Sequence, residues 1–272
     1  MTPETWLDEL AHELTVRHVG ADDAMQAVVE AQAFLADSDG DPLVEFGSPG
    51  DYALRLATSL RPSAPPRSGR GAKTLVMADS LWKSFGKHHV LRDFSVVLRA
   101  GSVSVLIGAN GAGKSTLMRI LAGLLAPDSG TVWAECSVGY SPQAPSLNDY
   151  LTPVEHVRLF GTAAGMSQEV ASRAGARLAE CLGWDLAKES VCGSLSGGTR
   201  QKLNVVLAGL HTPEVILLDE PHQGLDYESS AMLWDLIAAW RDQGKHVLVA
   251  SHIREAIVHA DTVIEVPRLS KE

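Results

Sequence analysis

One eight-residue loop constrains the fold of this chain more than any other feature. Residues 108–115 read Gly-Ala-Asn-Gly-Ala-Gly-Lys-Ser, a complete G-x-x-x-x-G-K-[ST] pattern, and the apolar run Val103–Ile107 comes directly before it. Between a strand and a helix, this pattern is typical of a phosphate-binding loop, because glycines let backbone N–H groups wrap around phosphate oxygens and the helix dipole favours an anion. The apolar side chains expected on one side of that helix are Leu117, Ile120, Leu121 and Leu124.

A second apolar run ends in two carboxylates. Val215–Leu218 is followed by Asp219 and Glu220, and Asp219 lies 105 residues after Lys114 (219 − 114). Beside a phosphate-binding loop, Asp219 would hold Mg²⁺ and Glu220 would polarise an attacking water, while Lys114 neutralises phosphate charge and Ser115 can ligate the metal. Short β-rich runs alternating with helical runs indicate an α/β domain with a mostly parallel sheet. Kinases, GTPases and ATPases all remain open at this point.

A third motif decides among those classes. Residues 195–202 read Leu-Ser-Gly-Gly-Thr-Arg-Gln-Lys, and Ser196 lies 23 residues before Asp219 (219 − 196). This run resembles the signature of the ATP-binding cassette (ABC) ATPases, and the resemblance covers residues 73 to about 266. It implies the α/β P-loop NTPase fold of the ABC ATPases, with a RecA-like core, an antiparallel β subdomain and a helical subdomain at about 144–194.

Four further positions match that family in order. Phe85 stands where the family stacks an aromatic ring on adenine, Gln143 matches the Q-loop, Asp226 the D-loop and His252 the switch histidine. Each position alone is weak, but their order and spacing strengthen the resemblance. One departure is that residues 222–226 read His-Gln-Gly-Leu-Asp, where the family commonly has Thr-x-Gly-Leu-Asp. This histidine, next to the nucleotide site, could be a subgroup feature or a pH-sensitive contact, and we favour an ordinary structural substitution over the pH-sensitive role.

The resemblance also implies how the site is completed. Ser196 and Gly198 would begin a helix and form a second anion site, which in this family faces the γ-phosphate bound to another subunit. Two chains, expected here as a homodimer, would enclose two ATP molecules head to tail. The catalytic residues implied are Glu220, His252 and Lys114. The Mg²⁺ ligands implied are Ser115, Gln143 and Asp219. The nucleotide-contacting residues implied are Phe85, Gly108, Asn110, Gly111, Gly113, Lys114, Ser115, Thr116, Gln143, Ser196, Gly197, Gly198, Asp219 and Asp226.

The chain before this domain has a different character. Residues 1–60 favour a small helical domain, 61–72 a linker rich in proline, glycine, serine and arginine, and 73–272 the ATPase domain. Because about 60 residues give only a marginal core, Trp6 or Phe46 is a candidate to pack on something else. A first helix is expected from the spacing of Trp6, Leu7, Leu10 and Leu14, and a second helix from Asp22, with Met25, Val28, Val29, Gln32 and Leu35.

This N-terminal region is similar to the small helical HAAS-type signalling modules of Gram-positive bacteria. The motifs that carry the similarity are the Leu10–Leu14 run, Asp41-Pro42, Phe46-Gly47-Ser48-Pro49 and Tyr52-Ala53. Residues 1–72 hold 12 acidic and 5 basic side chains, a net charge of −7. An acidic appendage of this kind could dock to a permease or to another regulator, or could be a stabilising cap.

The composition of the whole chain narrows the class of partner. A formal net charge of −10 argues against direct binding of nucleic acid, which needs a basic surface. Three cysteines, an odd number, fit reduced thiols in a cytoplasm. The sequence shows neither a signal peptide nor a run of about 18 apolar residues. A transport role would therefore need a separate integral membrane permease, with this chain peripheral on the cytoplasmic face of a bacterial membrane.

Two functions are consistent with the motifs. Residues 150–160 resemble the opening of the helical subdomain in bacterial drug- and lipid-exporter ATPases, which favours an ATP-driven subunit of an export system for a small or hydrophobic compound. The alternative is a non-transport ABC ATPase acting on ribosomes or DNA, although such members usually carry two cassettes, long coiled coils or zinc cysteines. A catalytically dead cassette is disfavoured, because Lys114, Asp219, Glu220 and His252 are all present.

Overall fold

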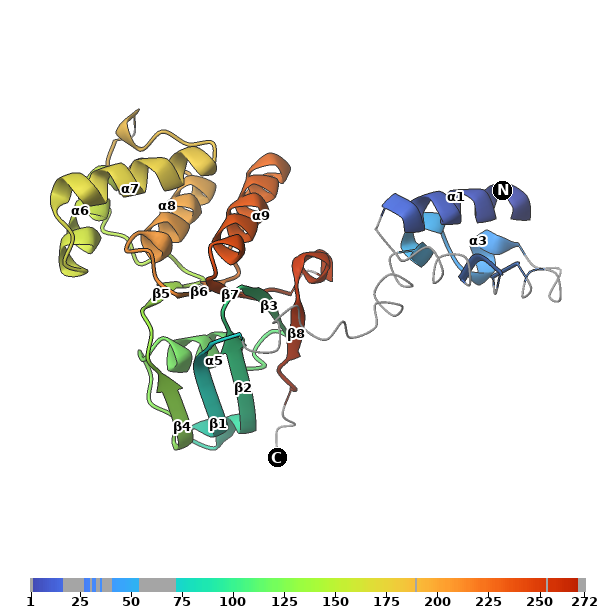
Figure 1. The fold of residues 1–272 in the computed structure, drawn as a ribbon, viewed down its shortest axis with the longest axis horizontal. Coiled ribbons are helices and arrows are strands. Elements are labelled where there is room, and N and C mark those ends of the chain that lie inside the picture. The colour runs from blue at the N-terminus through green and yellow to red at the C-terminus, as the bar shows by residue number, and fades with distance from the viewer. Residues whose placement is uncertain are drawn as a thin grey trace. The chain divides into compact units, whose positions relative to one another are not determined.

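The chain forms two compact units, Met1–Pro65 and Pro66–Glu272, in a computed structural model (Figure 1). The structure describes residues 2–16, 27–29, 31–32, 35, 41–53, 72–188, 190–252 and 254–268. The expected linker 61–72 lies outside the described residues, apart from Ala72. The start of the second expected helix, at Asp22, also lies outside them, whereas the described residues between 27 and 35 are helical.

The first unit has its own aromatic core. Helix α1 (Pro3–Val16) buries Trp6 completely, and the Trp6 ring centroid lies 5.3 Å from that of Phe46 and 5.5 Å from that of Tyr52. The Trp6 indole Nε1 donates a hydrogen bond to the Gly47 backbone O at 2.9 Å. Trp6 is therefore not available to pack elsewhere, which corrects the expectation from the sequence.

A short helix follows in the same unit. Pro42–Glu45 form the short helix α3, which the Asp41 side chain caps by accepting a hydrogen bond from the Leu43 backbone N at 3.0 Å. Proline at the first helical position loses no intrahelical hydrogen bond. Ser48 caps the helical residues that follow it, since its hydroxyl accepts a hydrogen bond from the Asp51 backbone N at 3.1 Å.

The second unit contains two sheets. Strands β1 (Thr74–Phe85), β2 (His88–Arg99) and β4 (Ser129–Ala134) form an antiparallel sheet in the order β2-β1-β4. A parallel sheet has the order β5-β6-β7-β3-β8. Its strands are β3 (Ser102–Ile107), β5 (Val138–Ser141), β6 (Val215–Asp219), β7 (His246–Ala250) and β8 (Thr262–Glu265).

Helices cover both faces of the parallel sheet. The α-helices described in the second unit are α5 (Lys114–Leu121), α6 (Pro153–Ala163), α7 (Gln168–Cys181), α8 (Gly197–Gly209) and α9 (Tyr227–Asp242). The 3₁₀ helices are η1 (Leu186–Lys188), η2 (Cys192–Ser194) and η3 (Arg254–His259). Figure 1 shows α6 to α9 on one face and α5 with the antiparallel sheet on the other. This arrangement matches the predicted α/β class and explains why β6 and β7 are buried along their whole length.

The burial of the strands alternates between these two faces. Val103 and Val105 of β3 belong to the core under α6 to α9, whereas Leu106 belongs to the core beside α5. Leu124, expected on the buried side of α5, lies beyond the end of that helix and is 60% exposed. Within the described ranges, no helix has the length and apolarity that a membrane crossing requires.

Candidate functional site

The glycine-rich loop 108–115 joins β3 to α5 at the carboxyl edge of the parallel sheet. Gly113 caps α5 with a φ of 106°, and a Cβ there would lie 2.7 Å from Val90 Cγ1, so only glycine fits without rearrangement. The Lys114 ammonium is buried inside the loop, where it donates hydrogen bonds to the backbone O of Gly108 at 2.8 Å and of Ala109 at 3.4 Å. This chain therefore builds the cationic cradle that the motif predicts.

The other predicted residues of the loop differ in exposure. Asn110 and Gly111 are exposed at its tip, whereas Ser115 and Thr116 are partly buried in the first turn of α5. The first turn of a helix has backbone N–H groups without intrahelical partners. A phosphate group in the loop would accept hydrogen bonds from these groups, as expected of such a loop.

A buried carboxylate lies at the end of β6. Both oxygens of Asp219 are buried without a hydrogen bond of ordinary geometry from the described residues. Burial raises the pKa of Asp219, while the nearby Ser115 hydroxyl and the Lys114 ammonium oppose that increase. Burial, and then the charge of Asp219, raise the pKa of Tyr140 to about 12. A carboxylate without a firm partner beside a serine hydroxyl offers the oxygen ligands that Mg²⁺ prefers, so these residues fit that ion.

Glu220 has an unusual backbone conformation and a paired side chain. Its φ is 50°, in the left-handed region that costs a non-glycine residue about 1–3 kcal/mol, and its backbone N donates to the Ala250 O at 3.0 Å. The carboxylate Oε2 lies 2.7 Å from His252 Nδ1, and Oε1 lies 4.0 Å from Lys114 Nζ. The fold thus brings the predicted catalytic residues Lys114 and His252 to the carboxylate of the third, Glu220.

The signature run forms the start of α8. Ser196 is the N-cap, and its hydroxyl accepts a hydrogen bond from the Thr199 backbone N at 3.1 Å. A Cβ on Gly198 would lie 2.6 Å from the Gly224 backbone O, so the signature packs directly on the predicted D-loop of the same chain. Gly197 begins the helix, and a Cβ added there would meet no other atom within 4 Å. The N-terminus of α8 therefore has the form of the second anion site that the motif implies.

Three predicted nucleotide contacts stand apart from this arrangement. Asp226 caps α9 by accepting a hydrogen bond from the Ser229 backbone N at 2.7 Å, which lowers its pKa. Phe85 is half exposed at the end of β1, and Lys83 Nζ lies 5.6 Å from its ring centroid. Gln143 is exposed after β5. Among the described residues, none of these three is hydrogen-bonded to the phosphate-binding loop.

Two residues close to the acid pair, in space or in sequence, were not predicted to belong to the site. Tyr140 reaches Asp219 from β5, and no local pattern distinguishes it from an ordinary strand tyrosine. His222 Nδ1 lies 3.0 Å from the Ser230 hydroxyl, and its ring centroid lies 5.0 Å from that of Trp234, which itself stacks on His259 at 4.3 Å. Burial lowers the pKa of His222 to about 4. These contacts fit the structural role that the sequence favoured for this histidine.

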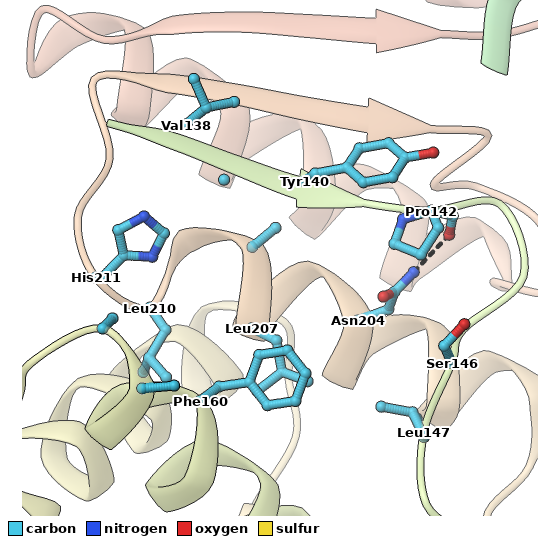
Figure 2. A pocket seen from close by; sticks show the side chains of 14 residues that line it. Val138, Tyr140, Pro142, Ser146, Leu147, Phe160, Asn204, Leu207, Leu210 and His211 are labelled. Atoms are coloured by element: carbon cyan, nitrogen blue, oxygen red, sulfur yellow. Dashed lines mark hydrogen bonds between the residues drawn. The ribbon is translucent and has the colours of Figure 1, made fainter. Parts of the chain in front are cut away.

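An apolar cavity of about 370 Å³ lies between β5, α6 and α8, beside the segment that carries Gln143 (Figure 2). Leu147 and Phe160 are among the residues that line it. Asn204 Nδ2 donates a hydrogen bond to the Pro142 backbone O at 2.6 Å and so ties α8 to the start of that segment. One wall of the cavity is therefore α8, the helix that begins in the signature run.

Comparisons with known proteins agree with these motifs. A family model described as ABC transporter matches residues 91–223. An uncharacterised ABC transporter ATP-binding protein of Methanocaldococcus jannaschii is 32% identical over 185 residues, covering 68% of this chain and 71% of that protein. Nod factor export ATP-binding protein I of Ralstonia nicotianae is 29% identical, covering 72% and 65%. The zinc import ATP-binding protein ZnuC of Pseudomonas fluorescens is 36% identical, covering 66% and 69%.

Solved structures give the same result for the fold. An ATP-binding subunit of an ABC transporter has a TM-score of 0.65 at 29% identity, covering 71% of this chain and 86% of that chain. A dimeric bacterial ABC transporter cassette also has a TM-score of 0.65, at 21% identity, covering 71% and 95%. The fold class predicted from the sequence is therefore confirmed.

Proposed function

The chain belongs to the family of ABC transporter ATP-binding proteins, which hydrolyse ATP, and from that premise we propose that it binds Mg-ATP between two copies of itself and hydrolyses it to drive a separate membrane permease. The observation that carries the proposal is the grouping of Lys114, Glu220 and His252 at one sheet edge, beside the unpaired carboxylate of Asp219. Catalysis would come from positioned charges, with no covalent intermediate on the protein.

Each residue has a definite task in this proposal. Lys114 leaves the loop carbonyls to pair with the β- and γ-phosphates. Ser115 and Asp219 would hold Mg²⁺, which would neutralise charge on the phosphate oxygens. Glu220 orients a water in line with the γ-phosphorus and draws its proton, while His252, held by that same carboxylate, contacts the γ-phosphate. The signature helix of the second copy closes the site with its N-terminal N–H groups.

The test of this assignment is Glu220→Gln. The amide keeps the size of the side chain but cannot accept a proton, so we expect ATP affinity to change less than threefold and kcat to fall about 10²–10⁴-fold. Mg-ATP should convert the variant to a stable dimer, as measured by light scattering. Glu135→Gln, at an exposed glutamate, is the matched control and should behave as wild type. Full turnover in Glu220→Gln would remove Glu220 from this role.

The apolar cavity supports the second half of the proposal. A groove lined by Leu147 and Phe160, next to the segment that carries Gln143, can accept an apolar helix from a permease. Such a partner would place the chain on the cytoplasmic face of a membrane. The relatives include both an export and an import protein and so do not decide the direction of transport. We propose export because residues 150–160 resemble the corresponding segment of exporter ATPases. No observation favours the ribosome or DNA alternative.

The N-terminal unit is proposed to be an accessory module of the HAAS type. Its support is the sequence similarity together with the small buried core around Trp6 among the described residues. Docking of this module to the permease or to a regulator would leave ATP hydrolysis to the second unit. Removing residues 1–72 should then keep the basal ATPase rate and weaken the association with membranes, and a loss of the basal rate would contradict this role.

A further inference from the structure

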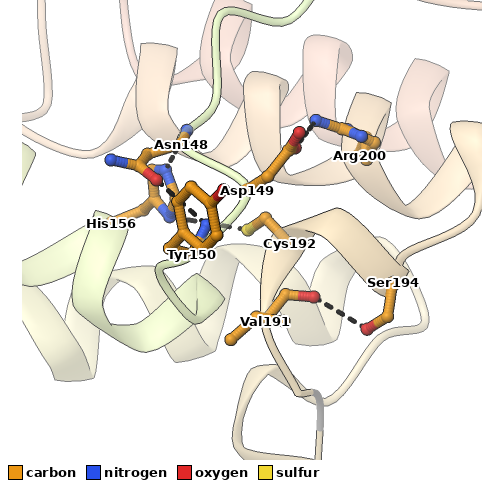
Figure 3. Close-up of polar contacts among 8 residues, drawn as sticks. All are labelled: Asn148, Asp149, Tyr150, His156, Val191, Cys192, Ser194 and Arg200. Carbon is orange, nitrogen blue, oxygen red and sulfur yellow. Dashed lines mark hydrogen bonds and ion pairs between the residues drawn. The ribbon is translucent and has the colours of Figure 1, made fainter.

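A polar cluster joins the start of the helical subdomain to the signature segment (Figure 3). Asp149 lies at the centre of the cluster and makes one contact with its backbone and another with its side chain. Its backbone O accepts a hydrogen bond from the Gly193 backbone N at 2.9 Å, and its carboxylate Oδ1 pairs with the Arg200 guanidinium. Gly193 is three residues before the helix cap Ser196, and Arg200 is four residues after it. One residue thus holds the chain on both sides of the N-terminus of α8.

The segment around Asp149 and the segment around Gly193 approach each other closely because residue 193 is a glycine. A Cβ on Gly193 would lie 3.1 Å from both the Cβ and the backbone O of Asp149, so a larger residue would push the segments apart. One residue earlier, the Cys192 backbone N donates to the Leu151 backbone O at 2.8 Å. Two backbone hydrogen bonds and one ion pair thus join the segment before α6 to residues 192, 193 and 200. Three contacts of this kind orient the start of α8 relative to that segment.

A buried histidine holds Asn148, the residue directly before Asp149. His156 of α6 accepts a hydrogen bond from the Asn148 backbone N at its Nε2, at 3.0 Å. Its Nδ1 lies 3.0 Å from the Thr152 backbone O and 3.5 Å from Cys192 Sγ. A neutral imidazole with its proton on Nδ1 satisfies both backbone contacts at once. The segment before α6 is therefore anchored to the body of the helix and is not a free loop.

We propose that Asp149 is a positioning residue, which holds Gly193 and Arg200 so that Ser196 and Gly198 meet the γ-phosphate bound by the second copy. This inference rests on the proposed function. The same segment begins five residues after Gln143, and Leu147 immediately before it lines the apolar cavity. A permease seated in that cavity and the nucleotide of the second copy would therefore be linked through Asp149, which connects the segment beside the cavity to the signature by a backbone hydrogen bond and an ion pair.

The exposure of the ion pair separates this role from a structural one. The side chains of Arg200 and Asp149 are 29% and 58% exposed, and ion pairs as exposed as this add little to folding stability. A change in the pair should therefore leave the fold and the chain's own ATP site intact. Its effect should fall on the step in which the signature meets the nucleotide of the other copy.

The test is Asp149→Asn in the Glu220→Gln background, measured as ATP-driven dimerisation by light scattering. We expect ATP affinity of the monomer and the melting temperature to stay as in the parent, and the dimer dissociation constant to rise at least about tenfold, which is about 1.4 kcal/mol. Arg200→Asp should act alike, and the double variant Asp149→Arg with Arg200→Asp should restore most of the dimer. Asp235→Asn, at an exposed aspartate of α9, is the matched control.

Three outcomes would overturn the inference. Dimerisation of Asp149→Asn equal to that of the parent would remove the positioning role, and so would a charge swap that fails to restore the dimer. A joint fall in melting temperature and monomer ATP affinity would show a structural role only. Failure of the Glu220→Gln parent to dimerise would be a different result, because it would contradict the proposed function itself and this inference with it.

Discussion

His246 begins β7 and His252 lies two residues beyond its end, and their surroundings give them different chemistry. His252 is 58% exposed and touches the Glu220 carboxylate, so it remains accessible to a nucleotide. His246 is buried, with Nδ1 2.8 Å from the Arg99 backbone O and 3.0 Å from the Ser102 hydroxyl. Its Nε2 has no hydrogen-bond partner among the described residues. Burial lowers the pKa of His246 to about 4, so it stays neutral.

This burial predicts an acid dependence of stability. An unfolded histidine takes up its proton near pH 6.5, whereas folded His246 does so near pH 4, so protons favour the unfolded chain as the pH falls through that window. Between pH 7.5 and pH 5 we expect His246 alone to reduce the free energy of unfolding by about 2 kcal/mol. Urea titrations at the two pH values measure this loss. In His246→Asn, which has no imidazole to protonate, the free energy of unfolding should fall by about 2 kcal/mol less than in wild type between pH 7.5 and pH 5. Parallel losses in variant and wild type would contradict it.

Helix α6 stabilises the fold and also contributes to the proposed docking surface for a permease. Thr152 and Glu155 form a reciprocal capping box at its start, with hydrogen bonds of 3.2 Å and 2.8 Å. On its inner side a Cβ on Gly161 would overlap the Ala171 side chain, so α6 and α7 are in close contact. Leu159 and Phe160 are both exposed on its outer side, but only Phe160 is among the residues that line the apolar cavity.

That difference gives a matched pair of variants for the docking surface. Phe160→Asp puts a charge into the apolar groove and should reduce the fraction of the chain that sediments with membranes at least about tenfold, because burying an unpaired charge is costly. Leu159→Asp changes the neighbouring exposed position and should sediment as wild type. Both variants should keep the basal ATPase rate of the purified chain. Equal sedimentation of the two variants would argue against the cavity as the docking surface.

The whole molecule consists of two units whose buried cores do not share residues. The first core gathers Trp6, Leu10 and Leu14 of α1 with residues between 27 and 53. The other two cores are formed only by residues of the second unit. A unit of about 60 residues has a small margin of stability, so the first core is sensitive to any single large change.

This division predicts two unfolding transitions that respond separately. Trp6→Ala removes the largest buried side chain of the first unit, at a cost of about 3–5 kcal/mol, which is comparable to the whole stability of so small a unit. Its transition should disappear in calorimetry, while the second transition stays in place. Mg-ATP should raise only the second transition, because ligands stabilise the unit that binds them. A shift of both transitions in Trp6→Ala would contradict this separation.

Much of the ATPase unit could be read from local pattern. The buried strands β3 and β6 appear as continuous apolar runs, because a parallel sheet covered on both faces needs them. The start of α8 follows from Ser196, whose hydroxyl can cap the helix. Two expectations about burial were wrong. Trp6 is buried by Phe46 and Tyr52, which are distant in sequence, so no local pattern shows its burial. Leu124 lies beyond the helix end at Leu121, because the position of a helix end is only weakly marked in the sequence.

The sequence by itself determined that this chain has a phosphate-binding loop, a pair of acids after a buried strand and an ABC signature, because each is a run of adjacent residues with a local physical meaning. Only the tertiary structure decided that Glu220 holds His252 across 32 residues and that Asp149 holds Arg200 across 51. Those contacts depend on the strand order β5-β6-β7-β3-β8 and on the packing of the helices over it. No local pattern encodes that order, since it is the shared burial of all the elements that selects it.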